Sequence, residues 1–275
     1  MLITNEILLR LSVYHRREFF RRWNHLKEEE WALADWRKKL EFLVPQFELK
    51  TSFKLPEKIQ FISMLDDEYP ASLFELPQPP LGLFVEGSLP KGPYVSVVGS
   101  RKPSPYSLRM TRSCVKNWVA RSYVVVSGGA LGIDGEAHRA ALDFEGKTIA
   151  VLGGGHHHLH PRRHENLFKE IVASGGGVLS EYPPHFLPRT YTFPERNRII
   201  AALGEEFFLA QAHERSGSLS TARASLDLGR DIFVLRPPAG DQNFLGSQKL
   251  IDAGAFALVN PDQINQDTSL PRWQF

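Results

Sequence analysis

The sequence predicts an α/β fold in which helices cover both faces of a doubly wound, mostly parallel sheet, preceded by a small N-terminal helical domain. Two observations carry this prediction. From Tyr94 onward, runs of β-branched and apolar residues alternate with segments at helical spacing. The runs VSVV, YVVV and TIAVL are continuously apolar, which is typical of strands buried on both faces of a sheet. In such a sheet, ligands bind beyond the carboxyl ends of the strands.

The elements follow in order along the chain. Residues 1 to about 44 indicate two or three short helices, because their apolar side chains recur at spacings of three and four. The basic residues there, from His15 to Arg22, could contact nucleic acid, although a solvated helix face explains them more simply. A proline-rich segment follows, and its apolar strand at Leu81–Val85 is expected along the edge of the main domain. Beyond it we predict strands at Tyr94–Val98, Tyr123–Ser127, Thr148–Leu152, Gly177–Ser180, Glu206–Gln211, Asp231–Leu235 and Phe256–Val259, and helices at Ser107–Arg121, Asp134–Phe144, Pro161–Ser174, Arg196–Leu203, Ser218–Leu228 and Ser247–Ala253.

Composition narrows the class of protein. The chain has 275 residues, of which 42% are hydrophobic and 23% charged, as in an ordinary globular protein. Its net charge of +2 is too small to indicate a nucleic-acid partner, so that case depends on where the basic residues lie. A single cysteine, Cys114, excludes an internal disulfide framework and fits a reducing compartment. Without a signal-peptide pattern or a long apolar run, we expect a cytoplasmic protein with no membrane segment.

The first strand-to-helix turn, Gly99-Ser100-Arg101 followed by Lys102, has features of a phosphate site. Its small residues bring backbone close to a ligand, and unpaired amides at the start of the next helix attract anions. The Arg101 guanidinium offers a planar pair of donors. For one tripeptide alone, an ordinary turn with an exposed arginine is the simpler interpretation, but similar turns recur after other strands.

The second turn, Ser127 to Asp134, contains Gly128 and Gly129, whose amides could approach a phosphate or a base. Asp134 is placed to cap the following helix and shares a helix face with His138. That pair could act as an acid and a base. We favour a cap and a packed histidine, because no nucleophile or metal set accompanies them.

The third turn carries GGGHHHLHPRR, from Gly153 to Arg163. Its histidines invite a metal interpretation, but neighbouring loop histidines rarely converge on one ion and no carboxylate lies among them. We expect instead that Gly155, Arg162 and Arg163 contact phosphate. No metal ligand, cofactor or catalytic residue is predicted.

Two further turns complete the set. Phe193 and Arg196-Asn197-Arg198 offer a stacking ring and two guanidinium groups around an amide. The segment from Ser216 to Ser218 adds hydroxyls at another helix start. Each helix start also has a purely structural interpretation. The candidate nucleic-acid-binding residues are Gly99, Ser100, Arg101, Lys102, Gly128, Gly129, Gly155, Arg162, Arg163, Phe193, Arg196, Asn197, Arg198, Ser216 and Ser218.

A row of such turns at one edge of a sheet, with aromatic rings for base stacking, fits a single-stranded polynucleotide. Neither G-x-G-x-x-G nor a Walker A sequence occurs, so dinucleotide and P-loop chemistry lose their main support. The alternative is a nucleotide or nucleoside-phosphate hydrolase of the lysine-decarboxylase-like type, built on the second turn with Asp134 and His138. The P-G-G-x-G-T-x-x-E signature of that type is absent.

Ordered motifs carry a family resemblance. The segments VGSRKPSPYS, SGGALGIDGEAHRAAL, FPERNRIIAAL and SGSLSTARASLDLGRDIFVL resemble the DprA/Smf family of DNA-processing proteins, over roughly Phe61 to Val259. The resemblance implies an extended Rossmann-like fold that binds single-stranded DNA, forms a homodimer and loads the RecA recombinase during natural transformation, without catalytic turnover. It places DNA contacts on Gly99 to Arg101, on the loop reaching Arg162 and around Phe193 to Arg198.

The chain also departs from the family pattern. The third loop reads GGGHHHLHP where the family has a G-T-G-L-D-like sequence, and the segment from Arg236 to Asp241 differs as well. The N-terminal helices resemble the family's small, SAM-like domain only in position and size. We therefore expect a helical domain with its linker over residues 1–60, the DNA-binding domain over residues 61–265, and a tail over residues 266–275 without a winged-helix domain.

Overall fold

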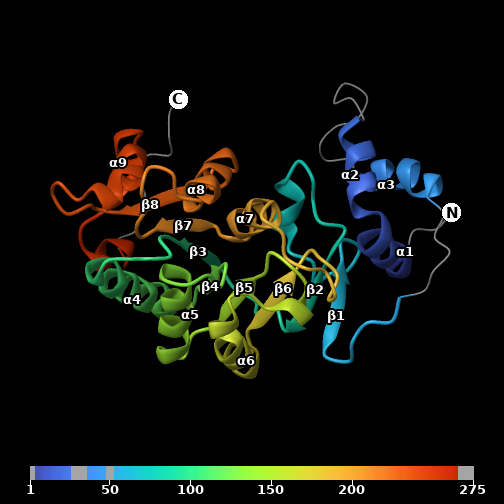
Figure 1. The fold of residues 1–275 in the computed structure, drawn as a ribbon, viewed down its shortest axis with the longest axis horizontal. Helices are drawn as coiled ribbons and strands as arrows, with labels where there is room; N and C mark the ends of the chain where they lie inside the picture. Colours follow the sequence, from blue (N-terminus) through green and yellow to red (C-terminus); the bar gives the residue numbers. More distant parts are fainter. Residues whose placement is uncertain (1–3, 26–35, 48–52, 266–275) are drawn as a thin grey trace.

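A single sheet organises the molecule, as the computed structural model shows for residues 4–25, 36–47 and 53–265 (Figure 1). Within these residues the sheet has nine strands in the order β1-β2-β6-β5-β4-β3-β7-β8-β9. Every pair from β6 to β9 is parallel, whereas β2 pairs antiparallel with both β1 and β6. This confirms the predicted α/β class and its mostly parallel sheet. The strands are β1 (Ile59–Ser63), β2 (Gly82–Gly87), β3 (Tyr94–Val98), β4 (Val124–Ser127), β5 (Thr148–Val151), β6 (Gly177–Ser180), β7 (Glu206–Leu209), β8 (Asp231–Leu235) and β9 (Phe256–Leu258).

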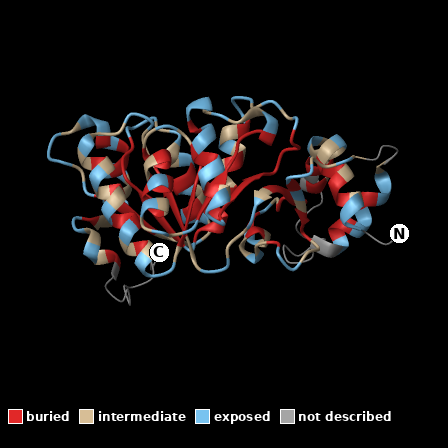
Figure 2. Cartoon of the chain, turned by 90° about the horizontal axis from the view of Figure 1, so that it is seen from below, coloured by how far each residue is buried: buried red, intermediate tan, exposed pale blue. Residues whose placement is uncertain are grey.

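Helices cover both faces of the sheet. On β3, Val95 and Val97 pack in a core cluster that includes residues of α4 and α5, while Val98 belongs to the cluster of α7 and α8. Buried residues accordingly lie along the strands between two helical layers (Figure 2). The helices are α1 (Asn5–Arg10), α2 (Arg16–His25), α3 (Trp36–Leu43), α4 (Pro105–Ala120), α5 (Ile133–Asp143), α6 (Glu165–Ala173), α7 (Thr192–Leu203), α8 (Ser218–Asp227) and α9 (Leu245–Asp252). None of these helices is long and apolar enough to cross a membrane.

The sheet extends further than the sequence indicated. The apolar segment beginning at Leu81 forms β2 as predicted, but β2 lies one strand inside the edge, because β1 pairs with it from Ile59↔Glu86 to Ser63↔Gly82. A positive φ at Gly87 ends β2, where a Cβ would lie 2.4 Å from the Gly176 carbonyl oxygen. The end of β2 therefore lies close beside the start of β6, where Gly87 pairs with Gly177.

The N-terminal helices pack against the same core as the sheet. Leu8, Phe19 and Leu40 belong to one buried cluster with Leu83 of β2 and Ile199 of α7. This confirms the prediction of short helices in the described part of residues 1–44. The division into domains at residue 60 stays a prediction, and the expected tail over residues 266–275 lies outside the described residues.

The strand order reverses between β3 and β7. From β3 the chain proceeds through β4 and β5 to β6 on one side, and from β7 through β8 to β9 on the other. The loops that leave the carboxyl ends of β3 and β7 therefore diverge and leave a crevice between them. This is where ligands bind in doubly wound sheets.

Candidate nucleic-acid interface

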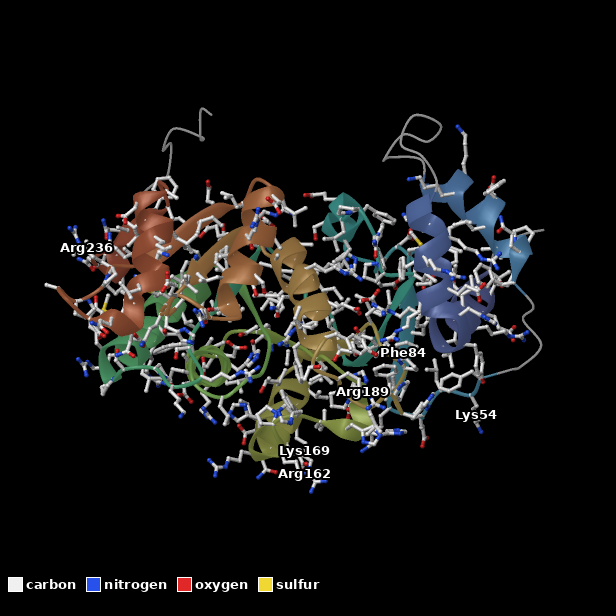
Figure 3. The ribbon with its side chains drawn as sticks, turned by 45° about the horizontal axis from the view of Figure 1, so that its top comes forward. Lys54, Phe84, Arg162, Lys169, Arg189 and Arg236 are labelled. Atoms are coloured by element: carbon white, nitrogen blue, oxygen red, sulfur yellow. The ribbon has the colours of Figure 1, made fainter. Side chains whose placement is uncertain are left out.

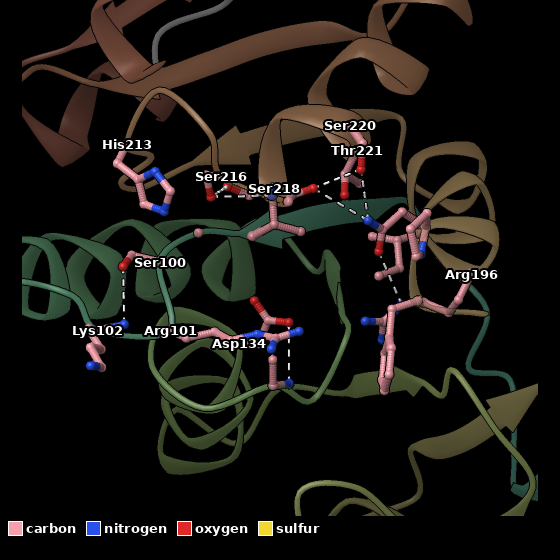
Figure 4. Close-up of a pocket in the computed structure, with 18 of the residues that line it drawn as sticks. Ser100, Arg101, Lys102, Asp134, Arg196, His213, Ser216, Ser218, Ser220 and Thr221 are labelled. Atoms are coloured by element: carbon pink, nitrogen blue, oxygen red, sulfur yellow. Dashed lines mark hydrogen bonds between the residues drawn. The ribbon is translucent and has the colours of Figure 1, made fainter. Parts of the chain in front are cut away.

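A cleft of ≈ 650 Å³ occupies this reversal point (Figure 4). We call it the switch cleft. Its walls come from the turns after β3, β4 and β7 and from the first turns of α7 and α8. Of the candidate residues, it brings together Gly99, Ser100, Arg101, Lys102, Phe193, Arg196, Asn197, Ser216 and Ser218.

The turn after β3 supplies the exposed positive charge. A Cβ on Gly99 would lie 2.7 Å from Ile133 Cγ1, so glycine is needed where the start of α5 packs against the turn. The Ser100 hydroxyl accepts from the Lys102 amide at 3.1 Å, which holds the turn shape. Arg101 and Lys102 are both exposed, and Arg101 extends toward Asp134 (Figure 4). This turn can offer two cations to a phosphate backbone.

Helix α4 begins at Pro105, two residues before the predicted start at Ser107, and its N-terminus is already capped. Ser104 accepts from the Ser107 amide at 3.2 Å and its own amide donates to Gln211 at 2.8 Å. The anion-attracting part of this turn is therefore its side chains, rather than the free helix end that we expected.

Arg196 fixes the turn after β4 from within the protein. Its side chain is 95% buried, and Nη1 donates to the Gly128 carbonyl at 2.6 Å and to the Val151 carbonyl. Burial lowers the pKa of Arg196 to about 10, so the guanidinium stays charged at neutral pH. Gly128 and Gly129 themselves lie outside the cleft lining, and the Gly129 carbonyl accepts from His164 Nδ1 at 2.9 Å. The second turn is thus a structural support beneath the cleft.

Asp134 and His138 do not form an acid–base pair. Asp134 Oδ2 accepts from the Ala130 amide at 3.3 Å, and the N-cap of α5 is Gly132, so the predicted helix cap is wrong. Burial raises the pKa of the Asp134 carboxyl, against the opposing charges of Arg196 and Arg101. His138 is fully buried with Nδ1 at 2.7 Å from the Thr148 hydroxyl, and burial lowers its pKa to about 3. The prediction of a packed histidine agrees with this burial.

The three residues Arg196, Asn197 and Arg198 point in different directions, because successive helical side chains are rotated by about 100°. Asn197 faces the cleft and donates to the Ser220 hydroxyl at 3.0 Å. Arg198 lies on the other side of α7, where it donates to both oxygens of Glu181 at 2.7 and 2.6 Å. The segment therefore presents an amide to the cleft, not two free guanidinium groups.

The third loop touches the cleft only at its margin. The His160 ring lies 5.8 Å from the Phe193 ring, between centroids, and Phe193 lines the cleft. Arg162 and Arg163 are exposed but lie outside the lining, and Arg162 projects from the α6 end of the molecule (Figure 3). Gly155 is buried, and a Cβ at this position would lie 2.2 Å from the Pro183 carbonyl oxygen, so its role is close packing. Within the described residues no cluster of acidic, histidine and cysteine side chains could hold a metal ion.

The start of α8 completes the cleft with hydroxyls. The Ser216 and Ser218 oxygens lie 2.7 Å apart, and both face the cleft opposite Ser100 (Figure 4). The sequence analysis did not single out His213, which also lines the cleft. It lies in the loop after β7, four residues beyond Leu209, and that position near a strand end was its available signal. Overall the cleft combines exposed cations, hydroxyls, an amide and one aromatic ring.

Residues 60–269 match the family of the DNA recombination-mediator protein A. The chain is 42% identical to protein Smf of Escherichia coli strain K12 over 198 residues, which cover 71% of this chain. It is 37% identical over 213 residues to the DNA processing protein DprA of Bacillus subtilis, covering 76% of this chain and 71% of that one. The chain belongs to the DNA recombination-mediator protein A family. It spans about half, 53%, of the length of the E. coli relative.

Solved structures of this family share the fold. DprA from Streptococcus pneumoniae matches with a TM-score of 0.77 at 31% identity, over 97% of this chain and 99% of that one. DprA from Helicobacter pylori, whose single-stranded DNA binding mode has been studied structurally, matches with a TM-score of 0.67 at 31% identity. That match covers 75% of this chain and 94% of the H. pylori chain. The extended Rossmann-like fold expected from the sequence motifs is confirmed.

Proposed function

We propose that this recombination-mediator family member binds single-stranded DNA in the switch cleft. The observation that supports this most is the meeting of exposed Arg101 and Lys102, the Phe193 ring and the α8 hydroxyls at the reversal point of the sheet. Cations suit the phosphates, and an aromatic ring suits an unpaired base of any sequence. The single-stranded DNA binding studied in the H. pylori relative supports the same ligand class.

The roles within the cleft follow from exposure. Arg101 and Lys102 contact phosphate oxygens, because their charged groups are exposed beside the backbone turn. Phe193 offers its ring as part of the cleft wall, and Ser216 and Ser218 donate to phosphate or sugar oxygens. Arg162 and Arg163 stay candidates for a strand that leaves the cleft past His160.

The test is fluorescence anisotropy with labelled single-stranded and duplex oligonucleotides across a salt series. Arg101→Ala should weaken single-strand binding by about tenfold at low salt and reduce the slope of log K against log salt by ~0.7, the value for one phosphate contact. Circular dichroism and unchanged thermal unfolding serve as the control for folding. Equal affinity in the folded variant would overturn the assignment of Arg101.

We extend the proposal to the partners that the resemblance implies. The protein forms a homodimer in the cytoplasm, protects incoming single-stranded DNA and loads RecA on it, without turnover of its own. RecA-driven strand exchange on DNA coated with single-strand binding protein measures the loading directly. Failure to stimulate exchange, at concentrations where the protein binds that DNA, would contradict RecA loading and leave DNA binding intact.

The hydrolase alternative depends on Asp134 and His138 acting on one substrate. Asp134 lines the cleft, whereas His138 is fully buried against Thr148. Incubation of the purified protein with nucleoside monophosphates tests this alternative. Release of free base that Asp134→Asn abolishes would favour the hydrolase over the binding protein.

A further inference from the structure

A second cavity of ≈ 560 Å³ lies where the N-terminal helix α2 meets α7. Arginines from both helices surround it, together with Phe20 and the segment after residue 76. The cavity and the switch cleft share α7 as a wall, because Glu195 and Arg198 face the cavity while Phe193 and Asn197 face the cleft. The cavity is lined by Arg16, Arg17, Phe20, Arg21, Pro77, Gln78, Glu195 and Arg198.

Two of its arginines are committed to the fold. Glu181 is 97% buried and accepts from Arg16 at 2.7 Å and from Arg198 at 2.7 and 2.6 Å. Arg16 also contacts Glu195 at 3.2 Å. Glu181 and Glu195 therefore balance the charges of Arg16 and Arg198. This set of ion pairs joins α2 to the sheet and does not supply free positive charge.

The remaining arginines leave positive charge at the rim. Arg17 is exposed and belongs to none of the ion pairs found among the described residues. Arg21 is 69% exposed and only 3.8 Å from Glu18, whose carboxylate is held by Arg22 at 2.5 Å. The single carboxylate of Glu18 thus neutralises only one of the two charges of Arg21 and Arg22. Together with Arg17, this leaves a surplus of about two positive charges at the rim.

An exposed ring connects this rim to the switch cleft. The Arg17 guanidinium carbon lies 4.4 Å from the centroid of the Tyr191 ring, and Tyr191 is 39% exposed. Tyr191 immediately precedes α7, two residues before Phe193 of the cleft. An arginine over an aromatic ring beside a cationic rim has the chemistry that holds a base and its phosphate.

We propose that the surface of Arg17, Arg21 and Tyr191, which we call the α2 rim, binds the phosphates of the same DNA strand after it leaves the switch cleft. This inference rests on the proposed function. The two sites are separated by the width of α7, about 10–12 Å for a helix with its side chains, which an extended strand crosses in a few nucleotides. The basic face of α2, which solvation alone could have explained, thereby becomes part of the binding path.

The experiment compares two oligonucleotide lengths by anisotropy in a salt series. A thymidine oligonucleotide of about 6 nucleotides fills the switch cleft, and one of about 20 reaches the α2 rim as well. The Arg17→Ala/Arg21→Ala variant should bind the long oligonucleotide about five- to tenfold more weakly at low salt, with a salt slope reduced by about 1.4. It should bind the short one as the unaltered protein does. The matched control is Lys91→Ala/Lys116→Ala, which removes two exposed charges from the loop before β3 and from α4 and should change neither affinity.

The outcomes separate the two proposals. Unchanged binding of the long oligonucleotide by the folded Arg17→Ala/Arg21→Ala variant overturns the α2 rim and leaves the switch cleft standing. An equal loss with Lys91→Ala/Lys116→Ala shows a general charge effect and also overturns it. If the unaltered protein binds neither oligonucleotide, the proposed function fails and the α2 rim fails with it.

Discussion

Two regions of the molecule each contribute an arginine to the switch cleft, and the two arginines differ in the hydrogen bonds that their guanidinium groups make within the protein. Arg101, in the turn after β3, is exposed and extends over the cleft. Arg196, in α7, lies 95% buried and donates to the carbonyls of Gly128 and Val151. As motif residues the two are equivalent, but Arg196 Nε and Nη1 donate to Asn197 and to the two carbonyls, whereas no hydrogen bond from the Arg101 guanidinium is found among the described residues. Free donors, rather than the presence of an arginine, separate a binding residue from a supporting one.

The largest test of this comparison is Arg196→Met, which keeps the volume and removes the donors. The carbonyls of Gly128 and Val151 lose a charged donor, and Asp134 loses the charge that most lowers its pKa. We expect the free energy of unfolding to fall by about 3 kcal/mol, measured by urea denaturation.

The matched variant is Arg101→Met, which we expect to affect DNA binding and not stability. Its free energy of unfolding should change by less than about 0.5 kcal/mol, because the side chain is exposed, while single-stranded DNA binding weakens. A stable Arg196→Met protein with lost DNA binding would show that Arg196 is a ligand, and the contrast between the two arginines would disappear.

The second test concerns Glu181, which holds Arg16 and Arg198. Burial alone would raise the pKa of Glu181, but the charges of Arg198 and Arg16 outweigh it and hold the pKa below its usual value. A carboxylate with a depressed folded pKa stabilises the fold above its unfolded pKa of ~4.3, and this stability is lost as pH falls through the folded pKa. We therefore expect acid destabilisation to begin below about pH 5.

Glu181→Gln removes that contribution. At pH 7 the free energy of unfolding should fall by about 2 kcal/mol, and its decline below about pH 5 should become shallower. Urea denaturation across a pH series measures both effects. The control, Glu170→Gln, alters an exposed carboxylate of α6 that belongs to none of the ion pairs found among the described residues, and it should leave the pH profile unchanged. A pH profile of Glu181→Gln parallel to that of the unaltered protein would contradict the assignment.

Much of the sheet was predictable because buried parallel strands have a direct sequence pattern. The bounds of β3, β6 and β8 are those predicted, since each is a short continuous run of mostly apolar residues bounded by a turn. Strand β1 was missed. It lies at the edge, its burial varies along its length, and the strand that holds it is antiparallel. The pairing of an edge strand depends on contacts with residues far away in the sequence, which the local pattern of apolar residues does not indicate.

The direction of the α7 side chains was less predictable. The sequence placed the helix start at Arg196, after Pro194, but α7 begins at Thr192, because proline is tolerated in a first helical turn. Arg196, Asn197 and Arg198 therefore lie in the second turn and point to three different surroundings. Whether a guanidinium group has a carbonyl or carboxylate partner depends on the tertiary structure. Nothing in the sequence around Glu181 indicated that it pairs with arginines.

The smallest expected effect concerns Asn197, which has features of both a ligand-binding residue such as Arg101 and a structural residue such as Arg196. It faces the cleft, yet its amide already donates to Ser220 at 3.0 Å and so links α7 to α8. Asn197→Ala should lower the free energy of unfolding by about 0.5 to 1 kcal/mol, because the hydrogen bond to Ser220 and the one that Asn197 Oδ1 accepts from Arg196 Nε are both lost. Single-stranded DNA affinity, measured by anisotropy, should fall by about twofold through the looser wall. A loss above about tenfold with unchanged stability would instead make Asn197 a direct ligand of a base edge, and it would then belong with Arg101 rather than Arg196.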